Sequence, residues 1–327
     1  MDKLRQMLSP YSHHHSNHES WPASLQTSVL KPLLDSDAIA ELRQRALRVI
    51  DLQMKNQTVL HRQHGEHMSA HRGYGLDYEE SRVYQPGDEM RFMNWRLTAR
   101  TGEAHVKIFR EERRPNAFIL LDTRHSMRFG TRVRLKVTQA LRAAVLLAFY
   151  NHYSGRSVSG LVLADHMQWL DSAGDEQSTL GMIHSMNQAC PPLSATSNPP
   201  DFAAVLRVLQ TTLTAGTKVF LLSDFMDATS QCQAALAHLA AKHTVSAIHI
   251  VDPAELQLPK AGKLRLSVAS LAKSRSVDTS NPQIAADFQG AVQQQLAARE
   301  SLIRGMGIAY VRLTTTIDSI ETAMDFT

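Results

Sequence analysis

Four apolar segments, each ending at or close to an aspartate, constrain the fold of this chain more than any other feature. The segments are Ala117–Leu121, Val158–Leu163, Val219–Ser223 and Val245–Val251, and the aspartates are Asp122, Asp165, Asp224 and Asp252. Continuous apolar runs of this length are typical of strands buried on both faces of a sheet. Segments with the apolar spacing of helices lie between them, so strands and helices alternate. The pattern predicts an α/β sandwich with a mainly parallel sheet.

The other elements follow from the same spacing rules. We predict helices over Leu135–Tyr150, Ser178–Gln188, Asp201–Leu213, Cys232–Lys242 and Pro282–Arg304, strands over Met167–Leu170 and Ile308–Leu313, and a small hairpin within Gln257–Asn281. The hydrophobic rhythm changes near Pro115, which indicates a domain boundary there. We therefore predict a disordered leader over residues 1–36, an N-terminal helical module over residues 37–115 and the α/β domain over residues 116–327.

The composition excludes several other classes of protein. Hydrophobic residues make up 43% and charged residues 20% of the 327 positions, as in an ordinary globular protein. No run approaches the roughly 20 apolar residues of a membrane span, and the first residues lack the apolar core of a signal peptide. Only Cys190 and Cys232 are present, which is too few for a disulfide framework. We therefore expect a cytoplasmic protein without a membrane span.

The charge distribution indicates a nucleic-acid partner only weakly. The net charge of +4 comes from 35 basic and 31 acidic residues, and the excess is concentrated between Arg91 and Lys136. Nucleic-acid binding through residues 91–136 is therefore an alternative hypothesis. Such a run is more often a solvated surface, and the lack of interleaved exposed aromatic residues counts against single-strand binding. We expect no nucleic-acid partner.

An unusual segment before the α/β domain contains several arginines beside acidic residues. The arginines are Arg82, Arg91, Arg96 and Arg100, and the acidic residues are Asp77, Glu79, Glu80, Asp88 and Glu89. Such a set either forms a structural ion-pair lattice or presents guanidinium groups to an acidic partner. We expect Asp88 to cap a short helix through Trp95, Gly102 to end that piece, and the Trp95 side chain to be buried.

The strand ends offer the best candidate site, because ligands of open α/β sheets gather at the carboxyl ends of the strands. Asp122 and Asp224 are expected at the same edge, on adjacent strands, and Ser126 lies four residues after Asp122. These oxygens suit a hard cation such as Mg²⁺, with the hydroxyl of Thr196 as a further candidate. Arg124 opposes the cation, because its guanidinium, if it points into the crevice, would neutralise the two carboxylates.

Motifs of enzymatic catalysis are missing from the sequence. We find no G-x-S-x-G, no Walker-type G-x-x-x-x-G-K-[ST], no H-E-x-x-H and no paired C-x-x-C. One enzymatic alternative stays open, a metal-dependent hydrolase at the Asp122/Asp224 crevice, with a bound water and His125 as the general base. Apart from Mg²⁺ at this crevice, the sequence indicates no cofactor.

From about Gly73 onward the chain resembles the bacterial "domain of unknown function 58" family. The resemblance rests, in order, on RVYQPGDEMRFMNWRLTAR (Arg82–Arg100), HVKIFREE, FILLDTRHSMRFG, VFLLSDFMD and IHIVDPAELQLP. It implies a von Willebrand factor A-like, Rossmann-like αβα sandwich. Such domains often carry a metal-ion-dependent adhesion site, D-x-S-x-S with a Thr and an Asp from other loops. Asp122, Ser126 and Asp224 match that pattern, whereas Arg124 replaces the middle serine, so the site is degenerate here.

The resemblance also implies a function. Members of that family are commonly associated with MoxR-type AAA+ ATPases, in systems thought to act as chaperones or in protein maturation. We therefore expect a non-enzymatic protein-interaction module or adaptor for such an ATPase and its client proteins. The candidate partner-binding residues are Arg124, which could receive a partner's carboxylate directly, and Arg82, Arg91, Arg96 and Arg100.

Overall fold

The computed structural model describes residues 32–63, 77–110, 116–171, 174–188, 200–226, 230–259, 261–267 and 274–324. Nearly all of the predicted leader, and Thr196, lie outside these residues. The chain divides into two compact units. The larger comprises the described residues up to Gln53 together with those after Pro115, and the smaller lies within Met54–Arg114.

A six-stranded sheet forms the centre of the larger unit. Its strands are β3 (Ala117–Asp122), β4 (Val158–Leu163), β5 (Met167–Leu170), β6 (Lys218–Ser223), β7 (Thr244–Val251) and β10 (Ala309–Thr314). They lie in the order β10-β7-β6-β3-β4-β5. Every neighbouring pair is parallel except β4 and β5, which form an antiparallel hairpin. The predicted α/β sandwich with a mainly parallel sheet is confirmed.

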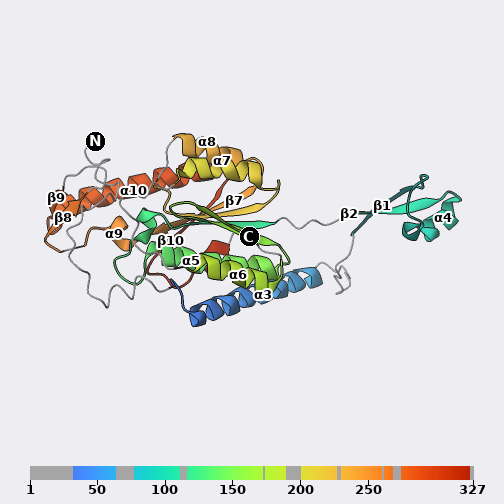
Figure 1. Cartoon of the computed structure of the whole chain (residues 1–327), viewed down its shortest axis with the longest axis horizontal. Coiled ribbons are helices and arrows are strands. Elements are labelled where there is room, and N and C mark those ends of the chain that lie inside the picture. Colours follow the sequence, from blue (N-terminus) through green and yellow to red (C-terminus); the bar gives the residue numbers. More distant parts are fainter. Residues whose placement is uncertain are drawn as a thin grey trace. The chain divides into compact units, whose positions relative to one another are not determined.

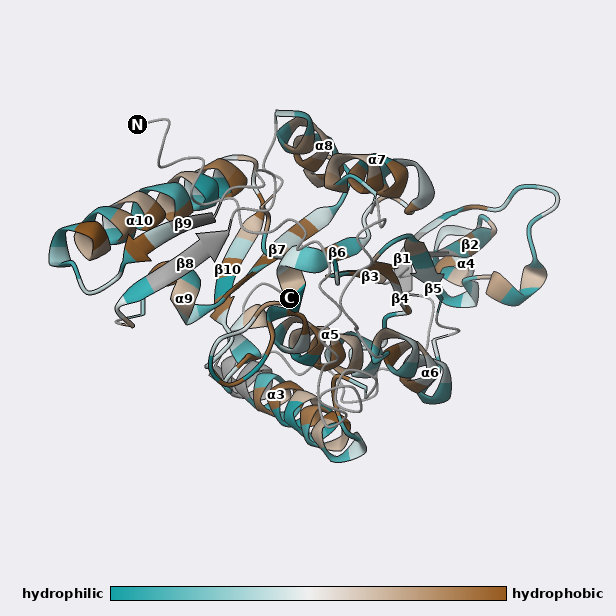
Figure 2. Cartoon of the chain, turned by 60° about the vertical axis from the view of Figure 1, so that its left-hand side comes forward, coloured by the Kyte–Doolittle hydropathy of each residue, from teal (hydrophilic) through white to brown (hydrophobic). Residues whose placement is uncertain are grey.

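Helices cover both faces of this sheet (Figure 1). On one face lie α3 (Ser36–Gln63), α5 (Lys136–Tyr153) and α6 (Glu176–Met186), and on the other lie α7 (Phe202–Thr212), α8 (Ser230–Ala240) and α10 (Pro282–Gly305). Side chains alternate along β3, so that Ile119 and Leu121 pack against the first set and Phe118 and Leu120 against the second. Figure 2 shows the apolar strands between the two helical layers.

The first helix packs on the sheet unit, which corrects the predicted grouping of residues 37–115. Asp35 caps α3, because its Oδ1 accepts from the backbone N–H of Ala38 at 2.7 Å. Ile39 and Leu42, on the same face of α3, are buried in the core that covers the sheet. The start of this helix therefore belongs with the α/β domain, because its apolar face matches the surface of α5 and α6.

Short elements connect or extend the sandwich. They are η2 (His125–Arg128), α9 (Pro253–Leu256), η3 (Glu321–Met324) and an antiparallel hairpin of β8 (Lys263–Ser267) and β9 (Ser274–Asp278). The hairpin lies within the segment where the sequence predicts one. Within the described residues, no helix combines the length and the apolar character needed to cross a bilayer.

The smaller unit is an antiparallel hairpin with short helical turns. It contains β1 (Asp77–Val83), η1 (Met90–Phe92), α4 (Trp95–Thr101) and β2 (His105–Arg110). Asn94, not Asp88, caps the helix, which begins rather than ends at Trp95. The Asp88 carboxylate instead holds the preceding turn, accepting from the N–H of Gln85 at 2.9 Å. Gly102 ends α4 with a φ of 78°, a left-handed conformation that glycine adopts without steric cost.

Candidate functional site

Asp122 and Asp224 lie at the same edge of the sheet. Strands β3 and β6 are parallel neighbours, and Leu121 stands opposite Leu222. Asp122 is the last residue of β3, and Asp224 comes directly after β6. The prediction that these carboxylates occupy one edge on adjacent strands is therefore confirmed. Both side chains are buried, at 0% and 1% exposed, so each charge needs a partner inside the protein.

The partner of Asp122 is Arg124. The Arg124 guanidinium donates from Nε to Oδ1 of Asp122 at 3.0 Å and from Nη2 to Oδ2 at 2.8 Å. The Ser223 hydroxyl also donates to Oδ2, at 2.6 Å. The guanidinium lies over the Phe202 ring, 5.3 Å from its centre, and this cation–π contact helps to hold it in place. Arg124 thus points into the crevice, as expected.

The partner of Asp224 is Lys136, a residue that the sequence did not single out. Its Nζ is fully buried and donates to Oδ2 of Asp224 at 2.9 Å and to Oε1 of Glu255 at 2.6 Å. Burial alone would lower the pKa of Lys136, but the two carboxylates raise it above its ordinary value. Burial would likewise raise the pKa of Asp224, but Lys136 keeps it lowered. Each carboxylate thus has its own cation, Arg124 for Asp122 and Lys136 for Asp224.

A sequence signal for Lys136 does exist. It is a lysine in the first turn of α5, a helix with the sequence KVTQALRAAVLLAFYNHY that is buried along most of its length. A helix buried along most of its length rarely carries a charge at its start unless that charge is paired. The partners cannot be identified from local sequence, because Asp224 and Glu255 lie 88 and 119 residues away.

Two residues of the short η2 turn differ in their surroundings. Ser126 is half-buried, and its hydroxyl contributes to the lowered pKa of the Asp224 carboxyl. Met226 also donates its backbone N–H to Oδ1 of Asp224, at 3.2 Å. His125, the expected general base, is exposed. The structure therefore brings the expected serine to the distant aspartate.

The remaining strand-end aspartates have other surroundings. Asp252, after β7, accepts from the hydroxyl of Thr315 at 2.8 Å and from the backbone N–H of Thr131 at 3.0 Å. With Glu255 it forms a capping box on α9. Burial would raise the pKa of Asp252, but hydrogen bonds from the Thr131 hydroxyl, the N–H of Ala254 and the Thr315 hydroxyl keep it lowered. Asp165 is exposed at the turn between β4 and β5.

A buried histidine contacts the residue that follows Asp224. His249 of β7 bonds the Tyr310 hydroxyl through Nδ1 at 2.6 Å, and Arg299 lies 3.4 Å from its Nε2. Burial, with a smaller contribution from Arg299, lowers the pKa of His249 to about 3. The ring also meets Phe225 edge to face, at 5.9 Å between centroids. Phe225 follows Asp224 and has a φ of 49°, a left-handed conformation that is rare for a bulky residue.

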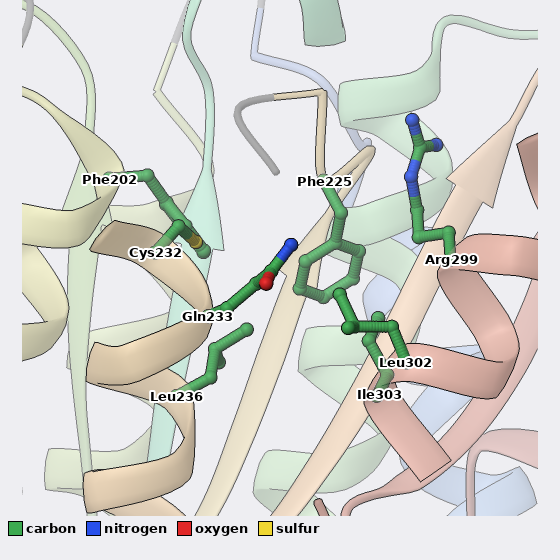
Figure 3. A pocket seen from close by; sticks show the side chains of 8 residues that line it. All are labelled: Phe202, Phe225, Cys232, Gln233, Leu236, Arg299, Leu302 and Ile303. Atoms are coloured by element: carbon green, nitrogen blue, oxygen red, sulfur yellow. The ribbon is translucent and has the colours of Figure 1, made fainter. Parts of the chain in front are cut away.

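A small pocket opens beside Phe225 (Figure 3). It is lined by Phe202, Phe225, Cys232, Gln233, Leu236, Arg299, Leu302 and Ile303. Figure 3 shows the Phe225 ring between the side chains of α8 and those of α10. The pocket is the gap between these helices, and its wall is predominantly apolar.

A divalent cation does not fit this edge. Mg²⁺ needs several oxygen ligands, but both oxygens of Asp122 already accept from Arg124, and Lys136 and Met226 each take one oxygen of Asp224. The two fixed positive charges would also repel the ion. Across the described residues, no group of three or more His, Cys, Asp or Glu side chains is arranged to hold a metal. Two internal cations thus occupy the carboxylates that would bind an ion.

In the smaller unit, two of the four candidate arginines form ion pairs. Arg82 donates from Nη2 to Oδ1 of Asp88 at 2.7 Å. Arg91 pairs with Glu89, which precedes it in the same turn. The pairing of Arg82 with the Asp88 turn supports the lattice hypothesis for that residue.

The other two arginines are exposed on α4 beside an exposed tryptophan. Arg96 and Arg100 form no ion pair with any residue in the described part of the chain. The expectation that Trp95 is buried is wrong, since it is 63% exposed. The physical reason is the position of Trp95 on a seven-residue helix whose half-buried face is formed by Leu97 and Thr98.

Fold and site together define an α/β sandwich with a mainly parallel sheet, in which internal ion pairs occupy the two carboxylates at the carboxyl edge. The chain belongs to the family described as "Protein of unknown function DUF58", whose model matches residues 80–298. Uncharacterized proteins of Mycobacterium bovis and Mycobacterium tuberculosis are 29% identical over 304 residues, which is 91% of this chain and 92% of theirs.

Solved structures with similarity to this chain include two bacterial proteins. The conserved hypothetical protein BatB from Bacteroides thetaiotaomicron has a TM-score of 0.39 and 14% identity, covering 64% of this chain and 94% of that one. A von Willebrand factor type A protein from Catenulispora acidiphila has a TM-score of 0.31 and 15% identity, covering 57% of this chain and 43% of the other.

Proposed function

We propose that this protein is a non-enzymatic protein-interaction module that acts as an adaptor for a MoxR-type AAA+ ATPase and its client proteins. Its role would be chaperone-like or in protein maturation, and its location the cytoplasm. The observation that supports the non-enzymatic part is that both carboxylates at the sheet edge are held in buried ion pairs, Asp122 with Arg124 and Asp224 with Lys136. The choice of partner rests on membership of the family and on the association with MoxR-type ATPases that the sequence resemblance implies.

These two ion pairs argue against the alternative of a metal-dependent hydrolase. Metal-assisted hydrolysis needs a cation with an open position for water and a base to take its proton. Here the two carboxylates that would hold the cation accept hydrogen bonds from Arg124 and Lys136. A buried carboxylate that is paired with a fixed positive charge is a weak base, because protonation would break the pair.

The Arg124–Asp122 ion pair also bears on which residues could bind a partner protein. Arg124 was a candidate to receive a partner's carboxylate, but its Nε and Nη2 already bond Asp122. A partner would have to displace a buried bidentate pair, and such pairs cost several kcal/mol to break. We therefore assign Arg124 a structural role and place partner binding elsewhere on the chain.

The test is a pull-down from the native cytoplasm with the full chain as bait, with and without ATP, followed by mass spectrometry. The proposal expects recovery of an AAA+ ATPase and a difference in recovery between the two conditions. Purified ATPase should then bind the purified chain directly. The proposal fails if no AAA+ ATPase is enriched over beads carrying an unrelated α/β protein.

A further inference from the structure

Among the described residues, the exposed face of helix α4 is the best candidate for a binding surface to which no role has been assigned. Trp95 and Ala99 lie four residues apart, as do Arg96 and Arg100, so the four side chains share one side of the helix. All four are exposed. The opposite side, with Leu97 and Thr98, is half-buried.

This face is held rigidly. The Asn94 side chain accepts from the N–H of Leu97 at 3.2 Å and donates to the Ser81 hydroxyl on β1 at 2.8 Å. The Thr98 hydroxyl accepts from the N–H of His105 on β2 at 3.0 Å. A surface fixed by such bonds before binding loses little conformational entropy when a partner docks.

The residue types on this face are those of binding hot spots. Tryptophan and arginine dominate the residues whose truncation costs most at protein interfaces, and methionine is enriched there as well. Trp95 is 63% exposed, and the same unit exposes Met90 at 64% and Val83 at 52%. A large aromatic side chain left in water favours association with an apolar surface.

The charges on this face specify the partner's chemistry. Residues 90–102 contain three arginines and no acidic residue. Arg91 pairs with Glu89, but Arg96 and Arg100 have no such partner among the described residues. Two like charges one helical turn apart repel each other, and an acidic partner would relieve that repulsion.

We infer that the face formed by Trp95, Arg96, Ala99 and Arg100 is a docking surface for an acidic protein segment that carries an apolar side chain. The apolar group packs on the Trp95 ring beside the small Ala99 side chain, and carboxylates pair with Arg96 and Arg100. The inference deepens the proposed function by naming the surface and the chemical class of its partner.

A protein fits this face better than a single-stranded nucleic acid. Because Trp95 is exposed, the basic region does contain an exposed aromatic residue. Non-specific single-strand binding, however, uses several aromatic side chains along a basic groove. The described face has a single exposed aromatic residue on a convex helix, and Glu89 and Glu103 are exposed in the same unit.

The test uses a phage-displayed library of random 12-residue peptides, selected on the full chain. We expect enriched peptides to combine Asp or Glu with a large apolar residue. Their affinity, measured by fluorescence anisotropy, should fall at least tenfold for Trp95→Ala and for Arg96→Glu/Arg100→Glu. Val133→Ala, a matched change at an exposed residue of the larger unit, should leave it unchanged. All variants should keep the wild-type melting temperature, because each changes an exposed side chain.

Three results of these binding experiments would overturn the inference, and a fourth would come from the pull-down. The first is enrichment of peptides without acidic residues, and the second is binding that survives both changes on α4. The third is binding of a 30-residue oligo-dT that Trp95→Ala abolishes while no peptide is selected, which would assign the face to nucleic acid. An ATPase recovered equally by wild type and Trp95→Ala would overturn the surface alone, whereas acidic peptides without any ATPase would overturn the proposed function alone.

Discussion

The guanidinium of Arg124 bonds the carboxylate of Asp122 through two parallel hydrogen bonds, at 3.0 Å from Nε and 2.8 Å from Nη2. Only one residue separates them, so the pair is a local consequence of the sequence Asp-Thr-Arg at the end of a buried strand. A planar guanidinium matches both oxygens of a carboxylate, and the pair therefore closes Asp122 to other ligands. Lys136, from the first turn of α5, donates to one oxygen of Asp224, and the backbone N–H of Met226 donates to the other.

Removing Lys136 should destabilise the fold strongly. Lys136→Met leaves Asp224 and Glu255 facing each other without a cation, and breaking a buried pair in this way typically costs about 3–5 kcal/mol. Urea unfolding at pH 7 measures the loss. Lys107→Met, at an exposed lysine, is the control and should change stability by less than about 0.5 kcal/mol. A loss below about 1 kcal/mol for Lys136→Met would contradict the assigned role.

The same variant should reverse part of the pH dependence. In the wild type the pKa of Asp224 is lowered, so its contribution to stability is present above the unfolded pKa and is lost as the pH falls through the folded one. Without Lys136, burial raises that pKa instead, and protonation then favours the folded state. The stability difference between wild type and Lys136→Met should shrink as the pH falls from about 7 to 4. A difference that stays constant would contradict this electrostatic account.

His249 should make the protein sensitive to mild acid. Its folded pKa is lowered to about 3, so the unfolded chain binds a proton first and stability falls as the pH drops from about 6.5. The slope approaches about 1.4 kcal/mol per pH unit for one proton. His243, whose pKa burial also lowers, contributes in the same range. Unfolding of His249→Phe between pH 7 and 4.5 should show a shallower slope than wild type, and an unchanged slope would remove His249 from this role.

The Trp95 side chain should contribute little to the free energy of unfolding. Because its ring is 63% exposed, Trp95→Ala should change the free energy of unfolding by less than about 1 kcal/mol. A buried tryptophan would instead cost about 3–5 kcal/mol. Acrylamide quenching of intrinsic fluorescence gives an independent measurement, since the variant should lose an accessible component. A loss of 3 kcal/mol or more would show that the ring is covered in the folded protein.

Much of the sandwich and one half of the site were predictable from local sequence. Apolar runs of strand length gave β3, β6 and β7, and parallel strands must end at the same edge, so Asp122 and Asp224 had to meet. Arg124 was foreseeable because it is two residues from its partner. Lys136 was not, because its role depends on residues brought close only by the fold.

The errors in the smaller unit have a common origin. Tryptophan is usually well buried, but that expectation needs a second layer of structure, and the short α4 places Trp95 on its exposed side. The grouping of the first helix with this unit failed for a similar reason. Helical spacing shows that an apolar face exists, but not which surface it covers.

The central claim is that Arg124 and Lys136 take the place of a bound ion at this edge, and calorimetric titration with Mg²⁺ and Mn²⁺ tests it most directly. Wild type should give no binding heat at millimolar concentrations of either ion. Arg124→Ser restores the missing hydroxyl, and Arg124→Ser/Lys136→Met also frees Asp224, so binding should appear and strengthen in that order. The single variant keeps the test valid if the double one does not fold. Tight binding of Mg²⁺ or Mn²⁺ by the wild-type chain would contradict the account.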